Sequence, residues 1–204
     1  DMVLTSISAY RKINVTVSSD IDQLPINMFN SDPLTDFVQM ASQELRITSP
    51  GTGPLRYVGG LYYYHQRGKM LREIYIGGSL TSGAFNEGKA TTNSYAAYLN
   101  VDYDVMPDLT LTGGLRYTNE KKTGAYLQIR GPVLSYDFDD LHRKDENVSW
   151  TASATYKPSD ALTLYATASK GFKSGGFNLD TIGAANLVGN DLVFGPESVV
   201  NYEA

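Results

Sequence analysis

The sequence predicts an all-β fold, and within that class an antiparallel transmembrane β-barrel to which this chain contributes about seven or eight strands. Three observations support the prediction. Apolar and polar residues alternate with a period of two over much of the chain, the alternating runs are long, and short and long connections follow one another between them. Together these features are typical of strands that cross a membrane.

The alternation is clearest between residues 93 and 105. Successive side chains of a strand point to opposite faces, so every second residue shares a face. One face here is mostly apolar and aromatic and the other is mostly polar, with Asn93, Tyr95, Ala97, Leu99, Val101, Tyr103 and Val105 against Ser94, Ala96, Tyr98, Asn100, Asp102 and Asp104. The pattern predicts one face against an apolar phase and one against water.

The same period predicts further strands. They are expected at residues 3–18, 37–48, 55–66, 109–118, 148–157 and 162–169, with the start of another at 197–203. The apolar face of the first is expected to carry Val3, Ile7, Ala9, Ile13, Val15 and Val17. No segment shows the spacing of an amphipathic helix, so no helix is predicted.

Strand length favours a membrane barrel over a soluble sheet. Several alternating runs reach about 10–16 residues, whereas strands of soluble proteins centre on about 5–6. A tilted strand needs about 9–11 residues to cross the hydrocarbon core of a bilayer.

The connections point the same way. Residues 49–54, 106–108 and 158–161 form short links rich in Pro, Gly, Asp and Ser, which suit tight turns. Long links are expected at about residues 20–34, 67–92, 122–147 and 170–194. Outer-membrane barrels have short periplasmic turns and long extracellular loops, and soluble domains rarely carry several loops of this length.

Composition excludes several classes of function. The 204 residues contain no Cys and carry a formal net charge of −5, so disulfides, thiolate metal sites and a nucleic-acid-binding surface are not expected. There is no run of about 20 apolar residues that would form a transmembrane helix. The two histidines, His65 and His142, lack the partners of a catalytic or metal-binding motif and are expected at the surface or at an interface.

Four stretches of the chain carry a family resemblance. They read SQELRI at 42–47, GGLRYT at 113–118, LYATASKGFKSGGFN at 164–178, and FGPES at 194–198 followed by Asn201, Tyr202 and Glu203. In this order they resemble the middle portion of the barrel of TonB-dependent outer-membrane receptors of the siderophore-receptor type.

The resemblance implies a location in the bacterial outer membrane and a barrel of about 22 strands. It further implies TonB-dependent active uptake of a scarce nutrient, with a ferric siderophore as the expected ligand. The expected partners are the TonB complex, acting through a plug domain, the small ligand and outer-membrane lipid. Residues 1–204 are expected to form a partial barrel domain that lacks the plug, the TonB box and the C-terminal strands. No enzymatic activity and no cofactor are expected.

Residues expected in the barrel lumen are candidates for contact with a ligand or the plug. They are Arg116, Glu120, Tyr62, Tyr64, Tyr98, Lys170 and Lys173. Arg116 and Glu120 share the polar face of the fifth expected strand, and the tyrosine rings are suited to stacking on a ligand or packing against a plug. The alternative for the charged members is a solvated lumen charge.

Other interpretations stay open from the residues alone. A passive porin or adhesin-like barrel would share the alternation, and a soluble β-sandwich that binds a ligand would cover its apolar faces with a second sheet. The many Ala and Gly on those faces suit lipid better than a close-packed core. The acidic run at 136–140 is expected to be a solvated loop, and the glycine-rich run at 171–176 lacks the residue order of a phosphate-binding loop.

Overall fold

The structure, a computed structural model, describes residues 1–25, 28–131, 134–180 and 188–204. Eight strands form one sheet, in which strands that follow one another in the chain also lie side by side. They are β1 (Val3–Asp20), β2 (Phe29–Thr48), β3 (Leu55–Ile76), β4 (Ser79–Met106), β5 (Leu109–Arg130), β6 (Leu134–Ser159), β7 (Leu162–Lys173) and β10 (Glu197–Glu203). Every pairing in this sheet is antiparallel, which confirms the predicted fold class.

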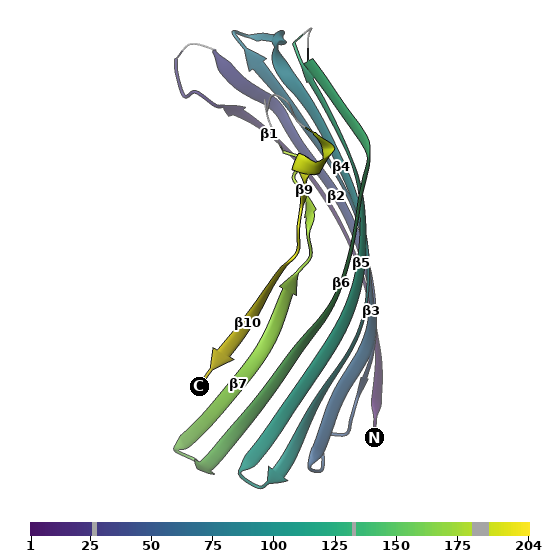
Figure 1. Ribbon diagram of the computed structural model, residues 1–204, viewed down its shortest axis with the longest axis vertical. Coiled ribbons are helices and arrows are strands. Elements are labelled where there is room, and N and C mark those ends of the chain that lie inside the picture. Colours follow the sequence, from purple (N-terminus) through teal and green to yellow (C-terminus); the bar gives the residue numbers. More distant parts are fainter. Residues whose placement is uncertain (26–27, 132–133, 181–187) are drawn as a thin grey trace.

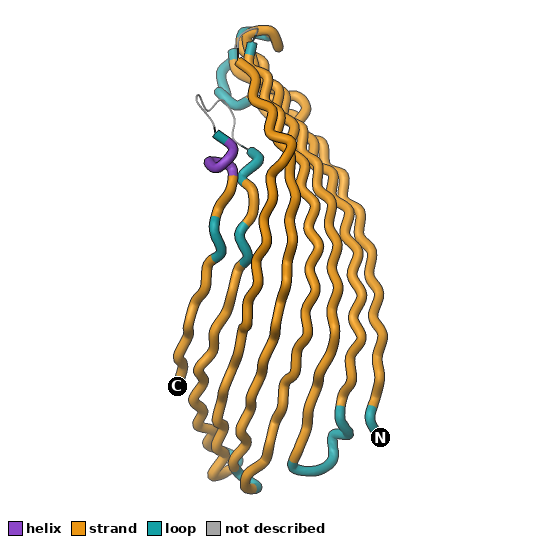
Figure 2. The backbone as a smooth tube through the Cα atoms, turned by 45° about the vertical axis from the view of Figure 1, so that its right-hand side comes forward, coloured by secondary structure: helices purple, strands orange, loops and turns teal. Residues whose placement is uncertain are grey.

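The sheet is open and strongly bent. Its two edges are β1 and β10, and the strands run side by side along a curved wall (Figures 1 and 2). Both chain ends lie toward the lower end of the wall in Figure 1, where the short turns also lie. We call this the turn end, and the opposite end the loop end.

The strands extend further toward the loop end than the alternation predicts. β3 continues to Ile76 and β4 begins at Ser79, so the expected long link at 67–92 is mostly strand closed by Gly77 and Gly78, which have φ of 60° and 74°. The link at 122–147 is shortened in the same way, because β5 ends at Arg130 and β6 begins at Leu134. Away from lipid both faces of a strand meet water, so apolar and polar residues no longer alternate. The backbone hydrogen bonds between the strands nevertheless continue.

One face of the sheet, the outer face, is apolar and uncovered. Leu61 pairs with Ala97, Ala97 with Tyr117, and Tyr117 with Val148, so these residues form one row across four strands. Leu61 is 62% exposed, although a soluble sandwich would bury such a residue under a second sheet. The other face, the inner face, carries the polar residues.

The first strand departs from this division. Its apolar residues share a face as expected, but Ile7 pairs with Glu44 and Glu44 with Tyr62, which places them on the inner face. The expectation that this apolar face would match the apolar faces of the other strands is therefore corrected. The periodicity defines two faces, and only the register with β2 decides which of them is the inner one.

The chain between β7 and β10 folds back over the inner face. It contains β8 (Gly176–Phe177), a short 3-10 helix η1 (Gly189–Leu192) and β9 (Val193–Phe194), and it lies inside the bend of the sheet (Figure 1). We call residues 174–180 and 188–194 the returning segment; residues 181–187 of the expected link at 170–194 lie outside the described residues. Leu179 and Leu192 of this segment pack with Tyr126 and Leu141 of the sheet. No helix in the described part of the chain has the length and apolarity needed to span a membrane.

Candidate functional site

A cavity of about 360 Å³ lies on the inner face beneath the start of the returning segment. Tyr62 and Tyr64 of β3 and Arg116 and Glu120 of β5 line its wall. Phe172 of β7 and Ser174 of the returning segment line it from the other side. The site is therefore built from three parts of the chain that are far apart in sequence.

The register of the sheet brings β3 and β5 side chains together across β4. Tyr62 pairs with Ala96, which pairs with Thr118, and Tyr64 pairs with Ser94, which pairs with Glu120. Ala96 and Ser94 are small and each only 6% exposed. Because the intervening side chains are small, the larger residues of the two flanking strands meet above them.

Arg116 has the most distinctive surroundings. Its guanidinium carbon lies 5.6 Å from the ring centroid of Tyr62 and 5.9 Å from that of Tyr98, within the range of cation–π attraction. Its Nε donates a hydrogen bond of 3.3 Å to Thr118 Oγ1. Among the described residues no carboxylate forms an ion pair with it, so its charge is available to an anionic group.

Tyr98 is fixed beside Arg116 by a hydrogen bond and by a glycine. Its hydroxyl donates to Glu44 of β2. A Cβ on Gly60 would lie 2.7 Å from the Leu45 carbonyl oxygen and 2.8 Å from the Tyr98 hydroxyl oxygen. The absence of a side chain at position 60 thus allows the Tyr98 ring to lie over β3.

Glu120, in contrast, already has partners. Lys122 Nζ lies 2.7 Å from a Glu120 carboxylate oxygen and donates to Ser174 Oγ at 2.8 Å, and Ser174 itself donates to Glu120. These contacts attach the returning segment to the wall and compensate the carboxylate. What remains for an incoming group is a cationic site framed by aromatic rings.

A second anchor holds the returning segment next to the cavity. Asp145 of β6, with a side chain only 6% exposed, accepts two hydrogen bonds from Arg143 at 2.8 and 2.6 Å. The same carboxylate accepts the Gly175 N–H at 3.1 Å. A Cβ on Gly175 would lie 2.2 Å from Arg143 Nε, so only glycine fits this position without displacement.

The structure groups five of the seven predicted contact residues. Tyr62, Tyr64, Arg116 and Glu120 line the cavity, and the ring of Tyr98 lies within cation–π distance of Arg116. Lys170 instead pairs with Trp150 on the outer face, and Lys173 is exposed and lies 3.9 Å from Glu197.

Sequence reasoning missed Phe172, Ser174 and Lys122. The first two reach the wall only because the chain leaves β6 after Lys170, where pairing of β6 with β7 ends, and crosses the inner face. The available signal was the cluster of Gly and Ser at 171–176, whose small residues permit this close approach.

The two histidines make local polar contacts. His65 Nδ1 lies 2.8 Å from Asn93 Oδ1, and the exposed His142 lies 2.5 Å from an Asp140 oxygen. Over the residues that the structure describes, no group of three or more His, Asp or Glu side chains is arranged to hold a metal ion.

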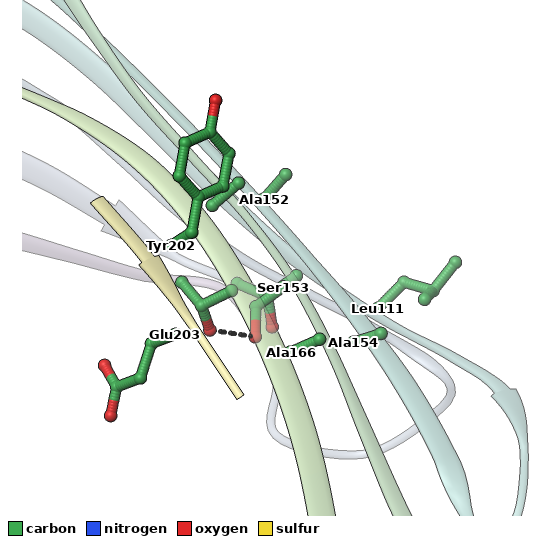
Figure 3. Close-up of a pocket in the computed structure, with 10 residues that line it drawn as sticks. Leu111, Ala152, Ser153, Ala154, Ala166, Tyr202 and Glu203 are labelled. Carbon is green, nitrogen blue, oxygen red and sulfur yellow. Dashed lines mark hydrogen bonds between the residues drawn. The ribbon is translucent and has the colours of Figure 1, made fainter. Parts of the chain in front are cut away.

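A larger hollow, about 590 Å³, lies against β5, β6, β7 and β10 (Figure 3). Leu111, Ala154, Ala166 and Tyr202 line it, and the register places them on the outer face. The small alanines leave room beside the larger side chains on the face that meets lipid, so this hollow is separate from the cavity at Arg116.

Comparison with known proteins agrees with this architecture. Residues 6–204 match the family model described as TonB dependent receptor-like, beta-barrel. Over 208 aligned residues the whole chain is 26% identical to the pesticin receptor of Yersinia pestis, of which it covers 28%, and to that of Yersinia enterocolitica, with the same coverage.

A solved structure shares the fold. The crystal structure of the ferric yersiniabactin uptake receptor FyuA from Yersinia pestis matches with a TM-score of 0.82 at 22% sequence identity, over 99% of this chain and 30% of that one. The chain thus spans less than a third of the length of these relatives. Receptors of this family are outer-membrane transport barrels and not enzymes, and on the match over residues 6–204 the chain belongs to the TonB-dependent receptor family as part of its β-barrel.

Proposed function

We propose that the receptor containing this chain takes up a ferric siderophore across the outer membrane by TonB-dependent active transport. The names of two relatives support this choice, since one is a ferric yersiniabactin uptake receptor and the other a pesticin receptor. The site on the inner face supports it independently.

The observation that carries the proposal is the Arg116 guanidinium, which has no carboxylate partner among the described residues and lies within cation–π distance of two tyrosine rings. Iron chelates present carboxylate or phenolate oxygens and often flat rings, which suit a cation framed by aromatic groups. We infer that Arg116 binds an anionic group of the chelate and that Tyr62, Tyr64 and Tyr98 contact its ring or chelate surface. Glu120 positions Ser174 and Lys122 at the border of the site.

Transport in this proposal is a conformational process. The ligand enters from the loop end and contacts the wall at Arg116, while TonB acts on the plug to open the path. No covalent step is required of the wall, whose residues bind and orient the ligand. The returning segment lies over the cavity and limits its opening.

The test is uptake of radioactive ferric yersiniabactin by cells that lack the receptor gene and carry the full-length gene on a plasmid. Siderophores purified from iron-starved cultures of the source bacterium serve as a second probe. Uptake is expected to require both the receptor and TonB. Uptake that persists without TonB would identify a passive barrel and contradict the proposal.

The site is tested with Arg116→Gln in the same receptor. Loss of a charged hydrogen-bond donor is expected to weaken ligand binding by about 10- to 100-fold. Lys157→Gln, which removes one exposed positive charge at the turn end, is the matched control and is expected to bind as the wild type does. Equal affinity of Arg116→Gln and wild type would exclude Arg116 as a ligand contact.

A further inference from the structure

Two pairs of lysines lie directly opposite each other in the sheet. Lys69 of β3 pairs with Lys89 of β4, and Lys121 of β5 pairs with Lys144 of β6. Like charges in directly opposed positions repel and destabilise a sheet. Two such pairs near one another concentrate positive charge on this part of the sheet.

Both pairs lie on the outer face, on the loop-end side of two tyrosines whose rings contact each other at an interplanar angle of 37°. Tyr63 and Tyr95 pair across β3 and β4, with ring centroids 5.0 Å apart. Two residues further toward the loop end, the next row of outer-face residues contains Lys121 and Lys144. Arg67 follows in the row after it, and Lys69 with Lys89 in the third.

On β1–β6 the outer face is divided at these tyrosines, whereas Lys170 of β7 lies on the turn-end side, where it pairs with Trp150 on the outer face. Toward the turn end it continues with apolar residues such as Leu61, Ala97 and Leu99. On β1–β6 every described lysine or arginine of the outer face lies on the loop-end side. Aromatic residues at the boundary of an apolar band mark the membrane interface, so the cations stand at the level of lipid headgroups.

The chain compensates these cations only in part. Glu87 forms ion pairs with Lys69, at 2.8 Å, and with Lys89, and Glu146 pairs with Lys144 at 2.5 Å. Lys121 and Arg67 are exposed and have no carboxylate partner among the described residues. The patch therefore keeps a net positive charge directed away from the barrel.

We propose that this basic patch, formed by Arg67, Lys69, Lys89, Lys121 and Lys144, binds the phosphates of a phosphorylated lipid in the membrane leaflet at the loop end. Lipid is favoured over a soluble anion because the apolar band directly below the patch accommodates acyl chains. Lys121 and Lys89 are four residues apart along the ladder, about 13 Å at the rise of a strand, so the patch is longer than one phosphate.

The test compares lipid binding by the purified full-length receptor in detergent. The probes are phosphatidic acid, phosphatidylcholine with the same acyl chains, and inorganic phosphate, and binding is measured by native mass spectrometry and by the shift in Tm. The double variant Arg67→Gln/Lys121→Gln removes two cations without breaking an ion pair. Lys157→Gln is the control at the turn end.

Phosphatidic acid is expected to bind more tightly than phosphatidylcholine. Each cation removed is expected to weaken this binding about fivefold, or about 25-fold for the double variant, while Lys157→Gln has no effect. Heat-modifiable gel migration verifies folding, and Lys121→Gln alone replaces the double variant if the latter does not fold.

Two results would overturn the proposal. The first is phosphatidic acid binding that is equal in the wild type and the variants. The second is displacement of the lipid by inorganic phosphate at the same concentration, which would indicate a site for soluble anions. The proposal does not depend on the transported ligand, and ferric yersiniabactin uptake is expected to be unchanged in variants that lose lipid binding.

Discussion

At the scale of single residues, the cavity depends as much on small side chains as on Arg116. Ala96 and Ser94 allow residues of β3 and β5 to meet, and Gly60 leaves space for the ring of Tyr98. The inner wall can thus bring two aromatic rings within cation–π distance of one guanidinium. Substitution of these small residues should disturb the site without removing any charged group.

Gly60→Ala tests this dependence. The new Cβ would meet the Leu45 carbonyl oxygen at 2.7 Å, and overpacking of this kind costs about 1–3 kcal/mol of unfolding free energy. Urea titration in lipid vesicles, followed by heat-modifiable migration, measures the change. Gly113→Ala is the matched control, because nothing lies within 4 Å of its Cβ. Equal stability of the two variants would show that the close approach at Gly60 is not required.

Glu87 gives the outer surface a predictable acid response. Its hydrogen bonds with Lys69 and then Lys89 lower the pKa of this carboxyl below its ordinary value, against the smaller opposing effect of burial. A depressed pKa in the folded state contributes stability above the unfolded pKa, which is about 4.3 for Glu, and this stability is lost as the pH falls through the folded pKa.

The unfolding free energies of wild type and Glu87→Gln in phosphatidylcholine vesicles should therefore differ by a constant amount between neutral pH and about pH 5. The advantage of the wild type should shrink as the pH falls below that range. Urea titrations at a series of pH values measure it. A difference independent of pH would show that the two lysines do not stabilise the carboxylate.

At the scale of elements, the returning segment is the part of the fold that completes the site. It is fixed by the Asp145 carboxylate on Gly175, by the Glu120, Lys122 and Ser174 contacts, and by the apolar cluster around Leu179 and Leu192. Gly124 of β5 makes room for Phe177, whose ring would lie 2.8 Å from a Cβ at that position. Loosening the segment should expose the cavity without unfolding the sheet.

Gly175→Ala is expected to loosen it selectively. The added Cβ would lie 2.2 Å from Arg143 Nε and 2.3 Å from the Phe194 carbonyl oxygen. We expect amide exchange at Asn178, which donates to the Leu192 carbonyl at 2.7 Å, to accelerate about tenfold or more, with the long strands unchanged. Hydrogen–deuterium exchange mass spectrometry measures this. Gly195→Ala, whose Cβ meets nothing within 4 Å, should exchange as the wild type does.

The elements also show where sequence reasoning succeeds and where it stops. Inside the apolar band the alternation is imposed by lipid on one side, and the expected starts at residues 109 and 162 agree with β5 and β7. Beyond the band both faces are wet, so β4 begins at Ser79 and not near residue 93. Their positions in the alternation were enough to place Arg116 and Glu120 on the polar face.

The alternation did not reveal the face of β1 or the approach of Phe172 to the cavity, and the expectation for Lys170 went against it. The face of β1 depends on its register with β2, which no local pattern encodes. Lys170 falls on the same face as the apolar residues before it in the alternation, and it pairs with Trp150 on the outer face. Only its charge suggested a place in the lumen. The approach of Phe172 to the cavity depends on a change in the course of the chain after Lys170.

At the scale of the whole molecule, the sheet formed by the described residues has two unpaired edges. β1 and β10 each pair with one neighbour, and the order of strands does not close on itself. Inside a bilayer each backbone group without a hydrogen-bond partner costs several kcal/mol, and closure of the barrel is what removes this cost. The apolar outer face therefore favours membrane insertion, whereas the open edges oppose it unless further strands complete the wall.

Residues 1–204 produced alone should therefore form no stable pore in lipid vesicles. We expect neither heat-modifiable gel migration nor single-channel conductance, whereas the full-length receptor should show heat-modifiable migration. A chain that closed by pairing β1 with β10 would produce both signals and would contradict this expectation. The same comparison separates two causes of failure, because circular dichroism that shows β-structure without a band shift would mean that the strands form but the edges prevent closure.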